Sequence, residues 1–461
     1  MINFCLLGWD EKNLNWITFA IKELAYRMGF EFKISFNEDK NDNSEFTVIY
    51  AAYPYTKDLT HGLILTALTS SNHYAPLEIE KNKKIWTAQN DNDFDIIKGS
   101  HFLLSLESEK GLSDDCYDNF QRIIQDKHPM KDYILEPFLE FNANYLKELI
   151  IKHGYTGKVN KFFNDYDLTV IMTHDVDGPS LINKFALFRS AFLGFIKNNK
   201  LERESFYFGV LSKIFKEEDP YWNFKYWVEL EKELGLKATY FFYPGKIKNA
   251  IHIKDPKYKF SNNIQKEIEN LEVNRMEIGL HSGININTTE LYLGSKKLIE
   301  KYTKSPILGH RAHYWAIDWK NPFESWHTLS KAGFKYDMSM SPMGIGYRNS
   351  TMYPVNTSKD KNKTFFVLAT AIMDGYCVDD KNIKIKIGKI IEDVVNNNGI
   401  LVLDWHIRTL FNAGAFSKYL DSFFFIMNEL KKYNVNYCTG NEVIEQWDHH
   451  IHKLYKGNTN E

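Results

Sequence analysis

The sequence predicts an α/β fold, a (β/α) barrel of seven or eight strands preceded by a smaller mixed α/β N-terminal domain. The 461 residues exceed the size at which one hydrophobic core usually stops growing. From residue 168 onward, short apolar runs alternate with helical patterns, as a parallel sheet with crossover helices requires. An open doubly wound sheet stays an alternative, although "THDVDG" (173–178) stands where its Gly-rich phosphate turn is expected.

Residues 1–160 are predicted to form the N-terminal domain. "FTVIYAAY" (46–53) has the composition of a strand, and "EPFLEFNANYLKELIIKHG" (136–154) has the periodicity of an amphipathic helix that ends at Gly154. A polar, Gly-containing stretch at 155–166 predicts the boundary. We therefore expect the barrel to span residues 161–450 and to leave 451–461 as a C-terminal tail.

The barrel region contains eight strand candidates with β-branched or aromatic runs. They are 168–173, 238–243, 276–280, 306–310, 334–339, 365–370, 400–405 and 435–439. Helical periodicity fills most of the intervals between them. The helix candidates are 221–234, 290–302, 324–333, 388–399 and 418–433.

The composition excludes several classes of protein. Hydrophobic residues make up 44% of the chain, which excludes a disordered scaffold. The net charge of −2 provides no global field for nucleic acid or anionic lipid, so a neutral substrate fits better. Four cysteines without paired spacing suit a reducing compartment. Acidic residues interrupt the N-terminal apolar patch too early for a secretory signal, and no run reaches the ~20 apolar residues of a membrane span. We expect a cytoplasmic protein.

Ionisable or metal-ligating side chains lie within or directly after the carboxyl end of five of the eight predicted strands, where the loops of a parallel barrel converge. They are His174, Asp175 and Asp177; His281 and Ser282; His310, Arg311, His313 and Tyr314; Asp337 and Ser339; and His406. Each alone is a weak signal, because a His or Asp at a strand end more often serves as a hydrogen-bonding or capping residue. The joint pattern predicts one site.

Carboxylates and imidazoles together are suited to a divalent metal. A metal with an open position activates water near neutral pH and polarises a carbonyl, so acyl hydrolysis is the predicted chemistry. Asp175 and Asp177 alternate along an extended segment and can share a face. One would bind the metal while the other accepts the proton of the water.

These residues make the region 166–445 similar to the polysaccharide deacetylases, carbohydrate esterase family 4 or the NodB-homology domain, whose fold is a distorted (β/α) barrel. Five segments resemble the family's motifs in order: "THDVDG" (173–178), "EIGLHSG" (277–283), "HRAHYW" (310–315), "YDMSMSP" (336–342) and "LVLDWH" (401–406). Residues 1–150 resemble the accessory N-terminal region of one bacterial branch, as do "GYRNSTMYP" (346–354) and "IMDG" (372–375).

The resemblance implies a role for each residue. Asp175 would be the catalytic base, with Arg311 orienting it, and His406 the general acid. Asp177 and His281 would bind the metal, most readily zinc, with cobalt, nickel or manganese as alternatives. The substrate-binding set would be Tyr314, Trp315, Asp337 and Ser339, with Asp337 acting through hydrogen bonds. The implied function is removal of an N- or O-acetyl group from a sugar or polysaccharide precursor.

One departure from the family pattern affects the metal site. The second His of the second motif is replaced by Asn285. His313 is the preferred third ligand, and Asn285, His310 and His174 are weaker candidates. Two other functions stay open: a degenerate deacetylase-like protein that binds carbohydrate as a scaffold, and a metal-dependent barrel of the amidohydrolase type, which expects His-x-His after the first strand.

Overall fold

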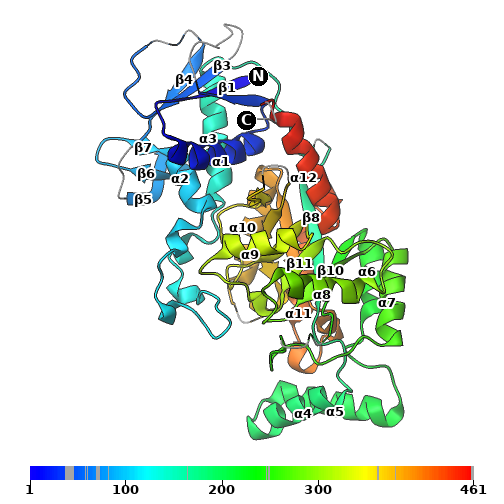
Figure 1. Cartoon of the computed structure of the whole chain (residues 1–461). Coiled ribbons are helices and arrows are strands. Elements are labelled where there is room, and N and C mark those ends of the chain that lie inside the picture. The colour runs from blue at the N-terminus through cyan, green and yellow to red at the C-terminus, as the bar shows by residue number, and fades with distance from the viewer. Residues whose placement is uncertain are drawn as a thin grey trace.

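The computed structural model describes residues 1–36, 46–57, 59, 61–68, 73–80, 83–163, 165–245, 247, 250–360, 363–378 and 380–457. Two main sheets lie side by side, each with helices against it (Figure 1). None of the helices in this described part combines the length and apolar character needed to cross a bilayer.

The N-terminal part is built on a parallel sheet in the order β2-β1-β3-β4. Its strands are β1 (Ile2–Leu7), β2 (Phe32–Ser35), β3 (Phe46–Ala51) and β4 (Gly62–Leu65). An antiparallel sheet of β5 (His73–Glu80), β6 (Lys83–Gln89) and β7 (Phe94–Asp95) lies beside it. The helices are α1 (Glu11–Met28), α2 (Ile96–Leu104) and α3 (Phe138–Lys152). The predicted strand at 46–53 and helix at 136–154 are confirmed.

The larger sheet has the order β13-β14-β12-β11-β10-β9-β8-β16-β15, with β17 also paired to β8. Its strands are β8 (Leu168–Val176), β9 (Ala238–Phe242), β10 (Glu277–Ser282), β11 (Gly309–Ala312), β12 (Tyr336–Met340), β13 (Val355–Asn356), β14 (Phe366–Ala369), β15 (Ile372–Met373), β16 (Ile400–Asp404) and β17 (Val435–Tyr437). All eight predicted strands are present, although the candidate at 306–310 lies a few residues later, as β11. The fully buried pattern of β8 explains its continuous apolar run.

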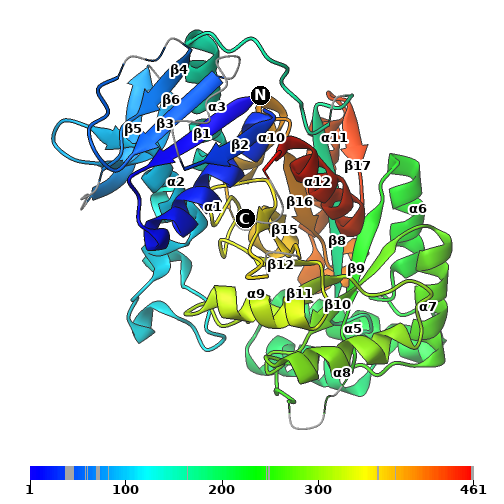
Figure 2. The same cartoon turned by 45° about the horizontal axis from the view of Figure 1, so that its top comes forward.

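The sheet curls because one short segment pairs at both ends of the parallel array. β14 pairs with β12, and β15, which follows two residues later, pairs with β16. Between them, the amides of Thr370 and Ala371 donate to the carbonyls of Met340 and Val402. Figure 2 shows β12, β11, β10, β9, β8 and β16 following one another around this curled sheet.

Most crossover helices pack on the outside of the curled sheet (Figure 2). They are α6 (Phe224–Leu234), α7 (Asn262–Val273), α8 (Thr289–Glu300), α9 (Pro322–Lys331), α10 (Ile383–Asn396) and α11 (Tyr419–Leu430). All five predicted helices are confirmed, and α7 was not predicted. A last helix, α12 (Gly440–Leu454), leads back to the N-terminal sheet, where Tyr455 bridges to Phe32. Residues 458–461 of the predicted tail lie outside the described residues.

Two further segments border the carboxyl ends of the strands. The first, residues 105–137, runs from the N-terminal sheets down along the curled sheet (Figure 1). The second is a helical hairpin inserted after β8, formed by α4 (Lys184–Ala191), a π-helical turn at Phe192–Ile196 and α5 (Lys200–Phe215). We call residues 184–216 the β8 hairpin. It projects away from the sheet at the end opposite β1–β4 (Figure 1).

Candidate active site

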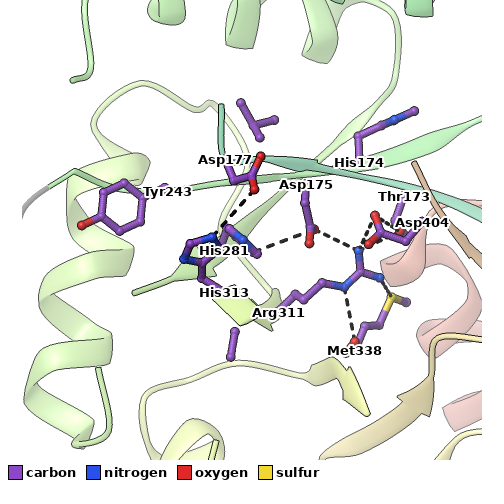
Figure 3. Close-up of polar contacts among 12 residues, drawn as sticks. Thr173, His174, Asp175, Asp177, Tyr243, His281, Arg311, His313, Met338 and Asp404 are labelled. Atoms are coloured by element: carbon purple, nitrogen blue, oxygen red, sulfur yellow. Dashed lines mark hydrogen bonds and ion pairs between the residues drawn. The ribbon is translucent and has the colours of Figure 1, made fainter. Parts of the chain in front are cut away.

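The end of β8 directs alternate side chains to opposite sides of the strand, as a pleated strand must. Thr173 and Asp175 point toward Arg311, whose Nη1 donates to Thr173 Oγ1 at 2.8 Å and to Asp175 Oδ1 at 3.0 Å. His174 points the other way (Figure 3). Its Nε2 lies 2.8 Å from Glu231 Oε1. At the end of this buried strand, Asp175 therefore faces the site, whereas His174 packs in the core.

Arg311 is fully buried, and two carboxylates share its charge. Its Nη1 lies 3.0 Å from Oδ1 of both Asp175 and Asp404. Burial by itself raises the pKa of Asp175, but neighbouring His281 and Arg311 hold that pKa well below its ordinary value. Burial raises the pKa of Asp404 to about 7, because Arg311 offsets only part of the effect and Asp175 adds to it. At neutral pH Asp175 is therefore the carboxylate of this pair that stays fully ionised, in the state of a general base.

His281 from β10 and His313 from the turn after β11 form a buried imidazole pair with ring centres 5.1 Å apart. Burial penalises the charged ring, so it lowers the pKa of His281 to about 3 and also lowers that of His313. Three of their ring nitrogens have no hydrogen-bond partner among the described residues: both nitrogens of His281 and Nδ1 of His313. Neutral imidazoles with unpaired nitrogens are the form that binds a metal.

Asp177 lies at the centre of the cationic and imidazole groups. Its Oδ2 is 3.7 Å from His313 Nε2 and 3.8 Å from His406 Nε2, while Oδ1 contacts Nη1 of Arg408 (Figure 3 shows the contact with His313). Two donors that each lie about 2.1 Å from one zinc ion are separated by roughly 3.4 Å in a tetrahedral site. The 3.7 Å separation is close to this value.

The donors fit a divalent metal by their chemistry: one carboxylate oxygen, the His281 ring with neither nitrogen hydrogen-bonded, and the His313 ring, whose Nδ1 lies 3.8 Å from Asp255 Oδ1. In the described part of the chain, no three His, Cys, Asp or Glu side chains already converge on one point at coordination distance. His281 Nδ1 faces Asp175 Oδ1 at 3.8 Å, and Arg408 holds the other oxygen of Asp177. The residues that could hold the metal are Asp177, His281 and His313.

The three weaker candidates for the third ligand are all engaged elsewhere. His174 Nδ1 lies 2.6 Å from the Trp405 carbonyl, and its other nitrogen contacts Glu231. Both nitrogens of His310 lie within hydrogen-bond distance of Asp337 or Ser282. Asn285 is exposed, and its amide donates to the Ile251 carbonyl at 3.3 Å. Of the four, His313 alone has a ring nitrogen near Asp177.

His406, which follows β16, is paired with Asp374, which follows β15. Nδ1 of His406 lies 3.0 Å from Asp374 Oδ1, and the backbone amide of His406 donates to Oδ2 at 2.8 Å. Burial opposes protonation of the ring, but the charges of Asp374, Asp404 and Asp175 outweigh it and raise the pKa of His406 to about 10. His406 is therefore an imidazolium at neutral pH and can donate a proton.

The fourth-motif residues lie behind the site in a closed hydrogen-bond network. Asp337 Oδ1 is 2.7 Å from His310 Nδ1 and accepts from Ser339 Oγ at 2.6 Å, and its Oδ2 accepts from Trp326 Nε1 at 3.2 Å. Ser339 in turn accepts from the Ala312 amide. Asp337 and Ser339 are fully buried. Their contacts fix the turn that carries His313 and Tyr314.

An aromatic pair borders the site and joins two parts of the chain. Tyr314 has a left-handed backbone with φ 54° and stacks on Phe120, with ring centres 4.3 Å apart and planes at 9°. The guanidinium of Arg122 lies over both rings and forms an ion pair with Asp118. Trp315 also has a positive φ, but its side chain is buried. The segment of residues 105–137 thus supplies Phe120 and Arg122 to the edge of the site.

Sequence reasoning missed several of these residues. Asp404 and Asp374 lie inside segments that resemble the family, but neither was assigned a role. Arg408 lies two residues after His406, so its proximity gave a signal that was not used. Phe120 and Arg122 come from the opposite end of the chain, and no local pattern marks them.

No protein-family model and no curated protein matches the chain. Solved structures similar to it include a candidate polysaccharide deacetylase of Mycobacterium smegmatis (14% identity, 62% of this chain and 92% of that chain, TM-score 0.41). The allantoinase PuuE (11%, 64% and 96%, TM-score 0.41) and the Bacillus cereus polysaccharide deacetylase Bc1974 (12%, 59% and 92%, TM-score 0.28) are two others. From likeness this remote we draw nothing about the chemistry of the site.

Proposed function

We propose that the protein is a metal-dependent hydrolase that removes an acetyl group from an N-acetylated sugar or polysaccharide precursor. The supporting observation is that three groups of side chains meet at the carboxyl ends of the strands. These groups are Arg311 with Asp175, His281 with His313 and Asp177, and Asp374 with His406. We also propose that this curled sheet is the distorted (β/α) barrel of the polysaccharide deacetylases. An O-acetyl group is the related substrate.

The metal would be held by Asp177, His281 and His313, most readily as zinc, with cobalt, nickel or manganese as alternatives. When bound, it supplies Lewis-acid activation of a water molecule and of the acetyl carbonyl. His313 takes the place that Asn285 leaves empty in the motif, because the Asn285 side chain is exposed and bonded elsewhere.

The chain's own residues carry the proton transfers. Asp175, kept ionised beside Arg311, accepts a proton from the attacking water. His406, kept protonated by Asp374, donates a proton to the departing amine of the sugar. The Tyr314 and Phe120 rings at the edge would face the apolar side of a pyranose ring.

The test is acetate release from an N-acetylglucosamine oligomer by the zinc-loaded protein. We expect Asp175→Asn to lower the rate at least about 100-fold, the scale of losing a general base. Asp421→Asn, which removes an exposed carboxylate on α11, is the matched control and should retain the rate. Release that persists in Asp175→Asn would remove Asp175 from the mechanism.

A second candidate function is carbohydrate binding without catalysis. The contact of Arg408 with Asp177 favours it, because this cation occupies one oxygen of the metal-binding carboxylate. Metal-free protein that binds the oligomer, while zinc-loaded protein releases no acetate, would support this function over hydrolysis.

A further inference from the structure

The β8 hairpin exposes an unusual amount of apolar surface. Eleven of the 25 exposed large hydrophobic residues of the described chain lie within residues 184–216. They are Phe185, Phe188, Phe192, Phe195, Ile196, Leu201, Tyr207, Phe208, Leu211, Ile214 and Phe215. Such a concentration of exposed apolar side chains in one element is typical of an interaction site.

The hairpin is amphipathic in the reverse sense of an ordinary surface helix. The buried residues of α5 are Glu202, Ser205, Gly209 and Ser212, which are small or polar. Ser205 Oγ accepts from the Ala415 amide at 2.9 Å, and Ser190 Oγ donates to Glu202 Oε2 at 2.9 Å. The protein therefore uses the polar face of the hairpin for its own packing and leaves the apolar face outward.

The charge of the hairpin indicates what covers the apolar face. Residues 184–216 carry seven Lys and Arg against two Glu, a net charge of +5 in a chain whose net charge is −2. Glu202 is buried, whereas Lys184, Lys197, Lys200 and Lys213 are exposed. Of the three acids that follow, Glu217 is exposed, whereas Asp219 accepts from the Leu181 amide and Glu218 accepts from the Tyr226 hydroxyl at the base of the hairpin.

We infer that the β8 hairpin docks on the surface of an anionic lipid bilayer. Exposed aromatic and aliphatic side chains accompanied by exposed Lys and Arg are features of helices that lie in a membrane interface. A symmetric pairing with a second copy is disfavoured, because it would bring two +5 surfaces together. The local field of the hairpin, rather than the near-neutral chain, supplies the attraction.

The hairpin lies next to the candidate active site. It begins a few residues after Asp177, and Lys257, on the loop that follows β9, lies 5.8 Å from the Phe185 ring. On the same loop, Ile253 is 79% exposed and Asp255 Oδ1 lies 3.8 Å from His313 Nδ1. Docking through the hairpin would thus hold the site near the bilayer surface.

The test is co-sedimentation of the full chain with vesicles of phosphatidylcholine, with or without phosphatidylglycerol. We expect binding to the anionic vesicles that falls at least about tenfold in the double variant Phe188→Glu and Phe215→Glu, and that weakens as salt is raised. The control is the double variant Val273→Glu and Ile385→Glu. Its sites are 73% and 75% exposed, against 70% and 67% in the test variant, and it adds the same charge elsewhere.

Three results would overturn the inference: no binding of the full chain to anionic vesicles, equal binding by the two double variants, or a stable dimer in light scattering that the hairpin variant dissociates. The dimer would make a second copy the occupant. The vesicle assay needs no hydrolysis, and both variants lie outside the proposed catalytic machinery. Its failure is therefore distinguishable from failure of acetate release.

Discussion

At the scale of single residues, protonation at the site is set by which charges share a partner. Arg311 lies between Asp175 and Asp404, and one cation cannot keep two buried carboxylates equally ionised. Asp404 therefore takes up a proton near pH 7 while Asp175 stays charged. His406, which forms an ion pair with Asp374, stays protonated. A base and an acid coexist at one pH, as the proposed hydrolysis needs.

This pattern predicts the effect of Asp374→Asn on the pH dependence of activity. The charge of Asp374 raises the pKa of His406 to about 10, so the proton-donating form persists as pH rises toward that value. Without this charge the pKa falls, and we expect the alkaline limb of the pH–rate profile to move to lower pH. Asp380→Asn, which removes the half-buried ion-pair partner of Lys386, is the control. An unmoved alkaline limb would contradict the pairing.

Five of the site residues were predictable from the sequence, because Asp175, Asp177, His281, Arg311 and His406 each directly end or follow a recognisable strand. Their partners were not. Asp374 follows the two-residue strand β15, which is too short to give a periodic pattern. His313 was preferred over Asn285 from its place in the third-motif turn, and the structure adds that His313 is buried near Asp177 while Asn285 is exposed.

At the scale of elements, the β8 hairpin depends on a close approach of its two helical segments. A Cβ at Gly194 would lie 2.7 Å from Arg203 Cα and 2.8 Å from Arg203 N, which are backbone atoms that cannot move independently. The guanidinium of Arg203 in turn donates to the Gly194 carbonyl at 3.0 Å. The two segments are thus joined at the point where only glycine fits.

We expect Gly194→Ala to loosen the hairpin by about 1–3 kcal/mol, the scale of overpacking. Hydrogen exchange of amides in 184–216 should accelerate while the strands β8 to β12 keep their protection. Gly294→Ala in α8 is the control, because no atom lies within 4 Å of the added Cβ and alanine favours a helix. Unchanged exchange in the hairpin would show that the segments can separate without cost.

The strands were easier to predict than this hairpin. A strand buried on both faces appears as a continuous apolar run, as in β8 and β16. The hairpin has helical periodicity, but its apolar face points outward, so a pattern that normally identifies the core identifies the exposed side. The expectation of no lipid attraction came from the whole-chain charge, which averages out the local +5.

At the scale of the whole molecule, a buried ion pair joins residues 105–137 to the part of the chain that forms the curled sheet. Arg348 forms an ion pair with Glu109 at 2.8 Å, and its guanidinium lies 3.5 Å from the Trp319 ring centre. His128 Nε2 lies 3.0 Å from the Glu109 carboxylate. All three side chains are buried. This cluster fixes the segment that brings Phe120 onto Tyr314, so the edge of the site depends on both parts of the chain.

We expect Arg348→Ala to lower the free energy of unfolding by about 3–5 kcal/mol in urea titration, because it leaves Glu109 buried and without its main partner. Burial raises the pKa of Glu109, but Arg348 and His128 outweigh it and lower the pKa to about 2. The paired carboxylate thus stabilises the fold above pH 4.5, and this contribution is lost as pH falls toward 2.

Between pH 4.5 and 2, the free energy of unfolding of Arg348→Ala should therefore fall less steeply with decreasing pH than that of the wild type. Arg189→Ala removes an arginine whose side chain is 57% exposed and should cost less than about 1 kcal/mol. Equal losses in the two variants would mean that the buried cluster does not stabilise the assembly of the N-terminal segment with the sheet.

The most direct test of the proposed chemistry is metal retention after equilibrium dialysis of the whole chain against zinc, with the bound metal measured by mass spectrometry. We predict one zinc per chain in the wild type and in Asn285→Ala, and loss of this zinc in Asp177→Asn, His281→Ala and His313→Ala. A wild type that retains no zinc, or one whose zinc is lost in Asn285→Ala but kept in His313→Ala, would contradict the proposed metal site.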